Sequence, residues 1–278
     1  LPKVAERLGE GQFAVGVSAG PETLVLAARM DAELYPGQSF VQGDIRNAYG
    51  DMERDAPLEE AAQISPLFGA VATASYAGCT TYLLPGAPAF TTDKGAIQGC
   101  PLGMALYCLA TRRPVAWAQT ILNEVADGRG AGVTGHAELA DMPDEARGLA
   151  AECVRLHTIQ GAIEGAVRTR TFADNALFRV PRGVEGMVPP IAQICLATRG
   201  LQYKPKAWEA WSPTPGLTTL PGVISVAHAP ADGMVVIGGA LGPLDVVGVL
   251  GGESAIAARL TRIRDAVQAF VDKLVAVP

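Results

Sequence analysis

Charge is scarce in this chain: 18% of its 278 residues are charged, 49% are apolar and only three are histidines. The high apolar content and low charge exclude a disordered chain and are typical of one with a buried core. His136, His157 and His228 lie far apart in the sequence, which favours surface or core positions over a shared metal site.

Long apolar runs and paired cysteines are also missing. No uninterrupted run reaches the roughly 18 residues that a spanning helix needs. The chain opens Leu1-Pro-Lys3 without a Met or an apolar segment, which predicts no signal peptide and suggests a piece of a longer protein. The five cysteines are odd in number and show no C-x-x-C spacing. This argues against a disulfide framework or a zinc site and favours an intracellular, reducing compartment, without separating nucleus from cytoplasm.

The net charge of −6 restricts how the chain could bind nucleic acid. Proteins that bind nucleic acid usually carry a basic face, so any such face here must be local. The candidate basic pairs are Arg112/Arg113, Arg168/Arg170, Arg179/Arg182 and Lys204/Lys206. The alternative for each pair is ordinary solvated surface.

The expected fold is α+β, with both helical and strand-like segments along the chain. The expected helices are 21–34, 57–76 with a break at Pro66, a run from Met104, a segment resuming near Asp144, 191–197 and the amphipathic stretch 256–274. Expected strands cover the approach to Asp44, 80–84, 167–172, 176–180 and 234–237. The two strands around Asp174 read as a β-hairpin with an acidic tip.

Two acids are placed alike in this pattern, because Asp44 follows one strand and Asp174 lies at the hairpin tip. If these strands are neighbours, both carboxylates could converge on divalent metal. Mg²⁺ needs only one or two protein carboxylates together with substrate phosphates. The alternative is that both are common turn or helix-cap aspartates.

Several motifs, in the same order, resemble those of reverse transcriptases, most closely the non-LTR retrotransposon type. They are Gln12-Phe-Ala-Val-Gly16, Asp44-Ile-Arg-Asn-Ala-Tyr49, Gly95-Ala-Ile-Gln98-Gly99-Cys-Pro101-Leu-Gly103, Phe172-Ala-Asp174-Asn175, Gly200-Leu-Gln-Tyr-Lys-Pro-Lys206 and Val236-Ile-Gly238-Gly-Ala-Leu-Gly242. The third motif is the most specific, and the series covers roughly residues 12 to 274.

The resemblance implies a catalytic centre formed by Asp44, Asp174 and Asn175. Asp44 and Asp174 would bind two Mg²⁺ ions, with Mn²⁺ as a possible substitute. Asn175 stands where the family has a second acid at the hairpin tip, so one ligand has lost its charge. An amide oxygen coordinates Mg²⁺ less strongly than a carboxylate does.

The resemblance also implies a nucleotide site. Tyr49 would exclude the 2′-hydroxyl of an incoming sugar, and Gln98 and Gly99 would lie against the nucleotide or template strand. Gly238 would belong to the turn that grips the primer end. Lys206 would bind nucleotide as the motif lysine, although it lies one position short and Ala207 fills the expected place. The alternatives are a core aromatic for Tyr49 and a helix-entry turn for Gln98-Gly99.

The expected architecture is a polymerase palm, an antiparallel sheet with helices packed on one face, over residues 1–242. Residues 1–35 and 55–95 would form partial fingers, and residues 243–278 would begin a thumb or connection helix. The family's basic fingers segment before Gln12 is not found in this chain.

The function implied is RNA-directed DNA polymerisation by a nucleotidyltransferase that uses two metal ions. Its partners would be an RNA template, a DNA primer and dNTP, without a membrane and with the oligomeric state open. One alternative is a decayed retrotransposon remnant or a nucleic-acid-binding module without polymerase activity. Another is a nucleotide-dependent α/β enzyme with a phosphate loop at 235–242, which the missing G-x-G-x-x-G spacing and Pro243 disfavour.

Overall fold

The computed structural model describes most of the first 242 residues. The described residues are 2–83, 85–86, 88–97, 99–129, 135–156, 163, 165–217, 224–237 and 239–242. Gln98, Gly238 and the predicted thumb region 243–278, with its amphipathic stretch 256–274, lie outside the described residues.

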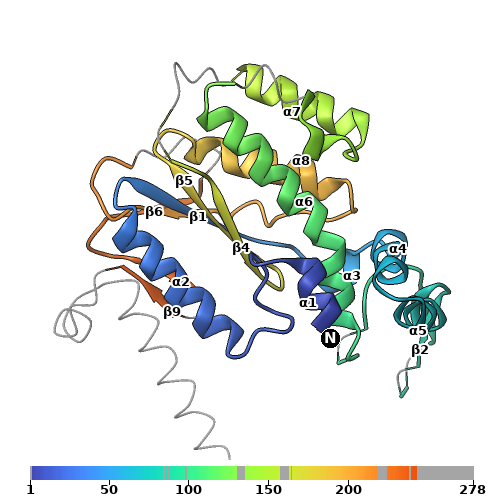
Figure 1. Cartoon of the computed structure of the whole chain (residues 1–278). Helices are drawn as coiled ribbons and strands as arrows, with labels where there is room; N and C mark the ends of the chain where they lie inside the picture. Colours follow the sequence, from blue (N-terminus) through green and yellow to red (C-terminus); the bar gives the residue numbers. More distant parts are fainter. Residues whose placement is uncertain are drawn as a thin grey trace, which may run out of the picture.

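A five-stranded sheet in the order β4-β5-β1-β6-β7 forms the centre of the described structure (Figure 1). Its strands are β1 (Gln38–Asp44), β4 (Arg168–Phe172), β5 (Asn175–Pro181), β6 (Glu209–Trp211) and β7 (Val226–His228). β1 is antiparallel to β5 and to β6, but β7 pairs parallel with β6. The sheet is therefore mixed, and the expectation of an antiparallel sheet is wrong at this edge.

The described helices surround this sheet. They are α1 (Pro2–Leu8), α2 (Gly20–Leu34), α3 (Ala48–Asp51), α4 (Asp55–Ile64), α5 (Pro66–Tyr76), α6 (Gly103–Ala126), α7 (Asp144–Leu156) and α8 (Val188–Ala197), with short 3-10 turns at Ala137–Leu139 and Glu185–Met187. Two small hairpins, β2–β3 (Thr80–Tyr82 and Phe90–Thr92) and β8–β9 (Met234–Val236 and Gly239–Leu241), complete the described elements.

Helices cover both faces of the sheet, so the expectation of helices on one face is wrong. Neighbouring residues of a strand point to opposite faces. Val41 of β1 packs into a large hydrophobic cluster with α6 and α8, while Phe40 packs into a second cluster with α2 and the β8–β9 hairpin. In β5, Phe178 packs into the large cluster and Leu177 into the second cluster. Both central strands are apolar on both faces, and each face needs a cover.

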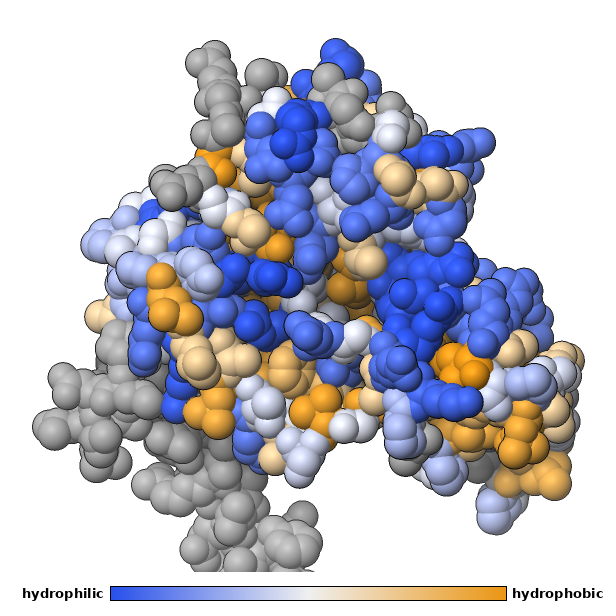
Figure 2. All heavy atoms as spheres, viewed as in Figure 1, coloured by the Kyte–Doolittle hydropathy of each residue, from blue (hydrophilic) through white to orange (hydrophobic). Residues whose placement is uncertain are grey.

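The segment 55–95 forms a helical hairpin followed by the small β2–β3 sheet, to one side of the large sheet (Figure 1). Its helices break where the sequence predicts, because Ser65 caps α5 by accepting a hydrogen bond from the Phe68 N–H at 3.3 Å and Pro66 occupies the first turn. Apolar side chains gather on the outer side of this segment (Figure 2). Two leucines of the segment, Leu67 and Leu83, are 75% and 79% exposed.

Most predicted elements are confirmed within the described residues. The helix at 21–34, the hairpin around Asp174 and the return to helix at Asp144 occur where expected. Among the described helices, none has both the length and the apolar content to cross a membrane.

Candidate functional site

Asp44 and Asp174 lie together at one end of the sheet. Asp44 is the last residue of β1 and faces Asn175, the first residue of β5, in the antiparallel register. The β4–β5 hairpin turns through Ala173 and Asp174, with Ala173 at a φ of +50°. The Ile45 N–H donates to the Asp174 carbonyl at 2.9 Å. The pairing of β1 with β5 therefore brings together two acids that are far apart in the sequence.

The two carboxylates influence each other. Burial, and after it the negative charge of Asp44, raise the pKa of Asp174 above its usual range, although a hydrogen bond from its own backbone and the charge of Lys204 oppose the shift. The Oδ1 atom of Asp44 is buried and accepts no hydrogen bond from the described residues. Asn175 donates from Nδ2 to the Asp174 Oδ1 at 3.3 Å. This end of the sheet thus holds more acidic oxygen than its described neighbours satisfy.

A divalent cation of the Mg²⁺ type fits this donor set. Hard cations prefer carboxylate oxygens, and Mg²⁺ takes one or two of them together with substrate phosphates and water. Asp44 offers a buried oxygen without a partner, and Asp174 lies beside it. Within the described parts of the chain, no group of three or more His, Cys, Asp or Glu side chains is placed to hold a metal. The acidic pair supplies two carboxylates, a set of protein ligands that such an ion can use together with substrate phosphates.

Lys204 is the lysine that reaches the acidic pair. Its ammonium forms an ion pair with the Asp44 Oδ2, and its backbone N–H donates to the Asp44 carbonyl at 2.8 Å. Lys206, the residue predicted from the motif, is exposed in the turn that follows. The sequence contained a signal for Lys204, since it belongs to the same motif, but the spacing of the motif directed attention to Lys206.

Tyr49 lies beside the acidic pair, in the short helix α3 that begins four residues after Asp44. Its ring stacks on Tyr107 of α6 with centroids 5.2 Å apart, and its hydroxyl donates to the Met104 Sδ at 2.9 Å. Burial, followed by the nearby Cys108 and Asp174, raises the pKa of Tyr49 to about 12. The half-buried ring is therefore a neutral, well-supported platform.

Tyr107 was not singled out from the sequence, because it lies in an apolar helical run. The ring is fully buried between the large cluster and Tyr49, and its hydroxyl has no hydrogen-bond partner among the described residues. Burial, with Tyr203 and Asp174 nearby, raises its pKa well above the usual value. Its role in the structure is to support the Tyr49 ring.

The segment 95–103 is held against α3. The Gly95 N–H donates to the Met52 carbonyl at 2.7 Å, and the Ala96 N–H donates to the Tyr49 carbonyl at 2.6 Å. Gly95 has a φ of +76°, and a Cβ there would lie 2.5 Å from the Tyr49 carbonyl oxygen, so the approach requires glycine. Gly99 is exposed, with a φ of +84° and open space around it. The structure thus brings this motif to the Tyr49 side of the acidic pair.

Gln12 connects the first motif to the core. Its Nε2 lies 2.7 Å from the Cys108 Sγ, and it pairs with Thr171 of β4 through an isolated parallel bridge. The adjacent Phe13 N–H donates to the Thr171 carbonyl at 2.9 Å. The segment at Gln12 and Phe13 therefore packs against β4 of the hairpin, and these contacts are with Thr171 and Cys108 rather than with Asp44 or Asp174.

Most of the basic pairs proposed from the sequence have internal partners. Arg112 and Arg113 form ion pairs with Glu60, and Arg170 and Arg179 with Asp31. Arg182 donates to the Ser212 hydroxyl at 2.9 Å. These residues stabilise the fold, which leaves Arg168, Lys204 and Lys206 as the exposed members of the proposed pairs, and of these Lys204 pairs with Asp44.

None of the five cysteines, all of which lie within the described residues, forms a disulfide bond. Two of them, Cys108 and Cys195, are buried in the large cluster, and burial raises the pKa of both to about 12. These two thiols are therefore packing residues.

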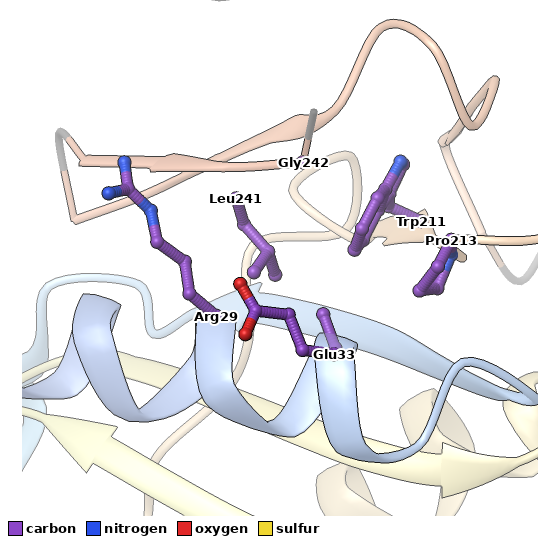
Figure 3. A pocket seen from close by; sticks show the side chains of 7 residues that line it. Arg29, Glu33, Trp211, Pro213, Leu241 and Gly242 are labelled. Carbon is purple, nitrogen blue, oxygen red and sulfur yellow. The ribbon is translucent and has the colours of Figure 1, made fainter. Parts of the chain in front are cut away.

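A separate hollow of about 290 Å³ lies between α2 and the β8–β9 hairpin (Figure 3). Arg29 and Glu33 extend from α2 toward it, and Trp211, Pro213 and Leu241 line the opposite side. None of the predicted site residues within the described part of the chain lines this hollow.

No protein-family model matches the chain, and no curated protein matches it. A function therefore has to be inferred from the geometry of the acidic pair and its neighbours.

Proposed function

We propose that this chain is a template-dependent nucleotidyltransferase of the reverse-transcriptase type, which extends a DNA primer on an RNA template with dNTP. One observation carries the proposal: Asp44 ends β1, and Asp174 lies in the turn that leads into β5, the antiparallel neighbour of β1, with the Ile45 N–H bonded to the Asp174 carbonyl at 2.9 Å. Each acid lies within a motif of that family. Unrelated turn aspartates have no reason to meet in this way.

In this proposal the sheet is a polymerase palm centred on β1 and the β4–β5 hairpin. Residues 1–35 and 55–95 correspond to partial fingers, and residues 243–278 begin the thumb. The central position of β1 and the support of the hairpin by α6 favour this assignment, because both acids then stand on a rigid, buried framework.

Asp44 and Asp174 would hold two Mg²⁺ ions, or Mn²⁺, together with the phosphates of the substrates. When bound, such ions stabilise the charge that develops during phosphoryl transfer. Asp44 contributes a buried oxygen that lacks a partner, and Asn175 orients Asp174 through the amide hydrogen bond at 3.3 Å. The side chains thus bind and orient, while the attacking group comes from the primer.

The neighbouring residues would select the nucleotide. Tyr49, fixed by Tyr107 and Met104, presents a rigid ring edge to the sugar. Gly99, next to Gln98 in the turn before α6, allows backbone to approach a base or sugar closely. Lys206 would contact the phosphates, and Gly238 the primer end.

Primer extension on an RNA template tests the proposal directly. Wild-type protein should incorporate dNTP only with Mg²⁺ or Mn²⁺, and Asp44→Asn or Asp174→Asn should reduce the rate by at least about a hundredfold. Asp232→Asn, which changes an exposed acid beyond β7, is the matched control and should extend like wild type. Equal extension by all four proteins would contradict the assignment.

A second candidate function is a nucleic-acid-binding module of the same fold that does not polymerise. Asn175 favours it, because its amide donates to Asp174 where the family has a second acid. The two functions differ in one measurement: a module would bind a primer–template duplex with the same affinity in wild type, Asp44→Asn and Asp174→Asn while extending it in none of them.

A further inference from the structure

Lys204 makes two separate contacts with Asp44. Its ammonium pairs with the Oδ2, and its backbone N–H donates to the carbonyl of the same residue at 2.8 Å. The two side chains are 47% and 32% exposed, so the ion pair lies at the mouth of the site rather than in the core.

Backbone contacts of the segment before Lys204 fix the position of this lysine. Gly200, with a φ of +69°, follows the end of α8 at Ala197 and turns the chain back along the end of β1. The Arg46 N–H then donates to the Gln202 carbonyl at 2.7 Å, and Ile45 pairs with Tyr203 in an antiparallel bridge. Tyr203 is buried, and its N–H donates to the Gln193 Oε1 at 2.9 Å. Lys204 is therefore fixed at its backbone, and only its flexible side chain is free to move.

The charges at this end of the sheet are unequal. Asp44 and Asp174 supply two carboxylates, and among the described residues Lys204 provides the ion pair to them. The nearest basic neighbour in sequence, Arg46, turns instead toward Asp51 at 4.0 Å. One ammonium thus occupies the carboxylate that a divalent ion would also use.

We propose that Lys204 is the resident counter-ion of the acidic pair, and that the first divalent metal ion binds by displacing its ammonium from Asp44. This inference rests on the proposed metal-dependent function and adds to it a residue that sets the affinity for the metal. The lysine stabilises the site without metal and competes with the ion that enters. Removing it lowers the stability of the metal-free protein and strengthens metal binding.

Calorimetric titration of the nucleotide-free protein with Mn²⁺ tests the exchange. Lys204→Gln should bind the ion about two- to fivefold more tightly than wild type, a range set by the modest strength of a half-exposed ion pair. Lys204→Arg keeps the charge and should bind no more tightly than wild type. Lys3→Gln removes an exposed lysine of α1 and should leave the Mn²⁺ affinity unchanged.

Thermal unfolding gives a second readout, the rise in melting temperature when Mn²⁺ is added. A lysine with a merely structural role would not change this rise. Without metal, Lys204→Gln should melt below wild type, and saturating Mn²⁺ should raise its melting temperature more than that of wild type. A lysine with only a structural role would lower both melting temperatures equally.

The outcomes separate this inference from the proposed function. If wild type binds Mn²⁺, Asp44→Asn abolishes binding and Lys204→Gln binds with wild-type or weaker affinity, the counter-ion role is overturned and the metal site stands. If wild type and Lys204→Gln both fail to bind the ion, the metal site itself is overturned, and the counter-ion role with it.

Discussion

Asn175 lies opposite Asp44 in the pairing of β5 with β1, and its amide bonds to Asp174 at 3.3 Å. Replacing it by Asp adds a carboxylate to a site that already has two, without a change in side-chain size. We expect Asn175→Asp to raise the rate of Mg²⁺-dependent primer extension by about tenfold, equivalent to about 1.4 kcal/mol. Extension rates measured across a Mg²⁺ series would show this.

Asn175→Ala is the control, because it removes the amide donor without adding charge. It should extend no faster than wild type. If Asn175→Asp also extends no faster at any Mg²⁺ concentration, the missing acid is not what limits the site.

Tyr49 offers a second test at the residue scale. Its ring is fixed by the stack on Tyr107, with centroids 5.2 Å apart, and by the hydroxyl contact to Met104. Tyr49→Ala removes the ring and should reduce discrimination against ribonucleotides by about tenfold, which is the size of effect that a lost steric contact produces. Incorporation of dNTP and rNTP in parallel extension reactions gives the ratio.

Tyr49→Phe distinguishes the ring from its hydroxyl. The Phe variant keeps the stack and loses only the contact to Met104, so its selectivity should stay near that of wild type. Unchanged selectivity in Tyr49→Ala would remove Tyr49 from the nucleotide site.

At the scale of elements, α2 is tied to the acidic hairpin through one carboxylate. Asp31 pairs with Arg170 of β4 through Oδ2 and with Arg179 of β5 through Oδ1 at 3.2 Å. The Asp31 side chain is only 10% exposed, so removing its charge leaves two arginines without their partner. We expect Asp31→Asn to destabilise the protein by about 3 kcal/mol. Urea unfolding would measure the change.

The matched control is Glu33→Gln, an exposed acid two residues along the same helix. It should change the free energy of unfolding by less than about 0.5 kcal/mol. Hydrogen exchange of the β4 and β5 amides should increase in Asp31→Asn only, and equal exchange in the two variants would show that α2 does not hold the hairpin.

Elements with a strong local signal could be predicted from the sequence. The hairpin around Asp174 shows strand alternation before its short acidic turn and an apolar strand after it, and α5 begins at Pro66 after a capping Ser65. In contrast, β6 and β7 are three residues each, and their pairing with β1 and with each other depends on contacts far along the chain. No local pattern specifies such short strands or their parallel arrangement.

The same reason explains what could be predicted of the site. Asp44 and Asp174 follow strands and carry motif signals, so sequence reasoning could single them out. The choice between Lys204 and Lys206 depends on the bridge between Ile45 and Tyr203, which sets which lysine reaches Asp44. That contact joins distant segments and leaves no trace in residue spacing.

At the scale of the whole molecule, Glu60 of α4 joins three helices. Its carboxylate is 5% exposed and pairs with Arg7 of α1 at 2.9 Å and with Arg112 and Arg113 of α6 at 3.2 and 2.7 Å. Burial alone would raise the pKa of Glu60, but the hydrogen bond from Arg7 and the charges of the other two arginines outweigh it and leave the pKa below its usual 4.5. The ionised form is therefore the one that stabilises this junction.

Glu60→Gln should destabilise the protein at pH 7 by about 3 kcal/mol, because three arginines lose a buried partner. A carboxyl whose pKa is lowered on folding contributes stability above its unfolded pKa and loses it as the pH falls through its folded pKa. The difference between wild type and variant should therefore be full at pH 7 and shrink below about pH 4.5, where Glu60 of the unfolded chain begins to take up a proton, until Glu60 of the folded protein is protonated as well. Urea unfolding between pH 7 and pH 3 would follow this change.

Glu59→Gln, at the exposed neighbouring position, is the control and should match wild type throughout. A loss of stability in Glu60→Gln that stays constant with pH would mean that packing rather than charge holds the three helices together.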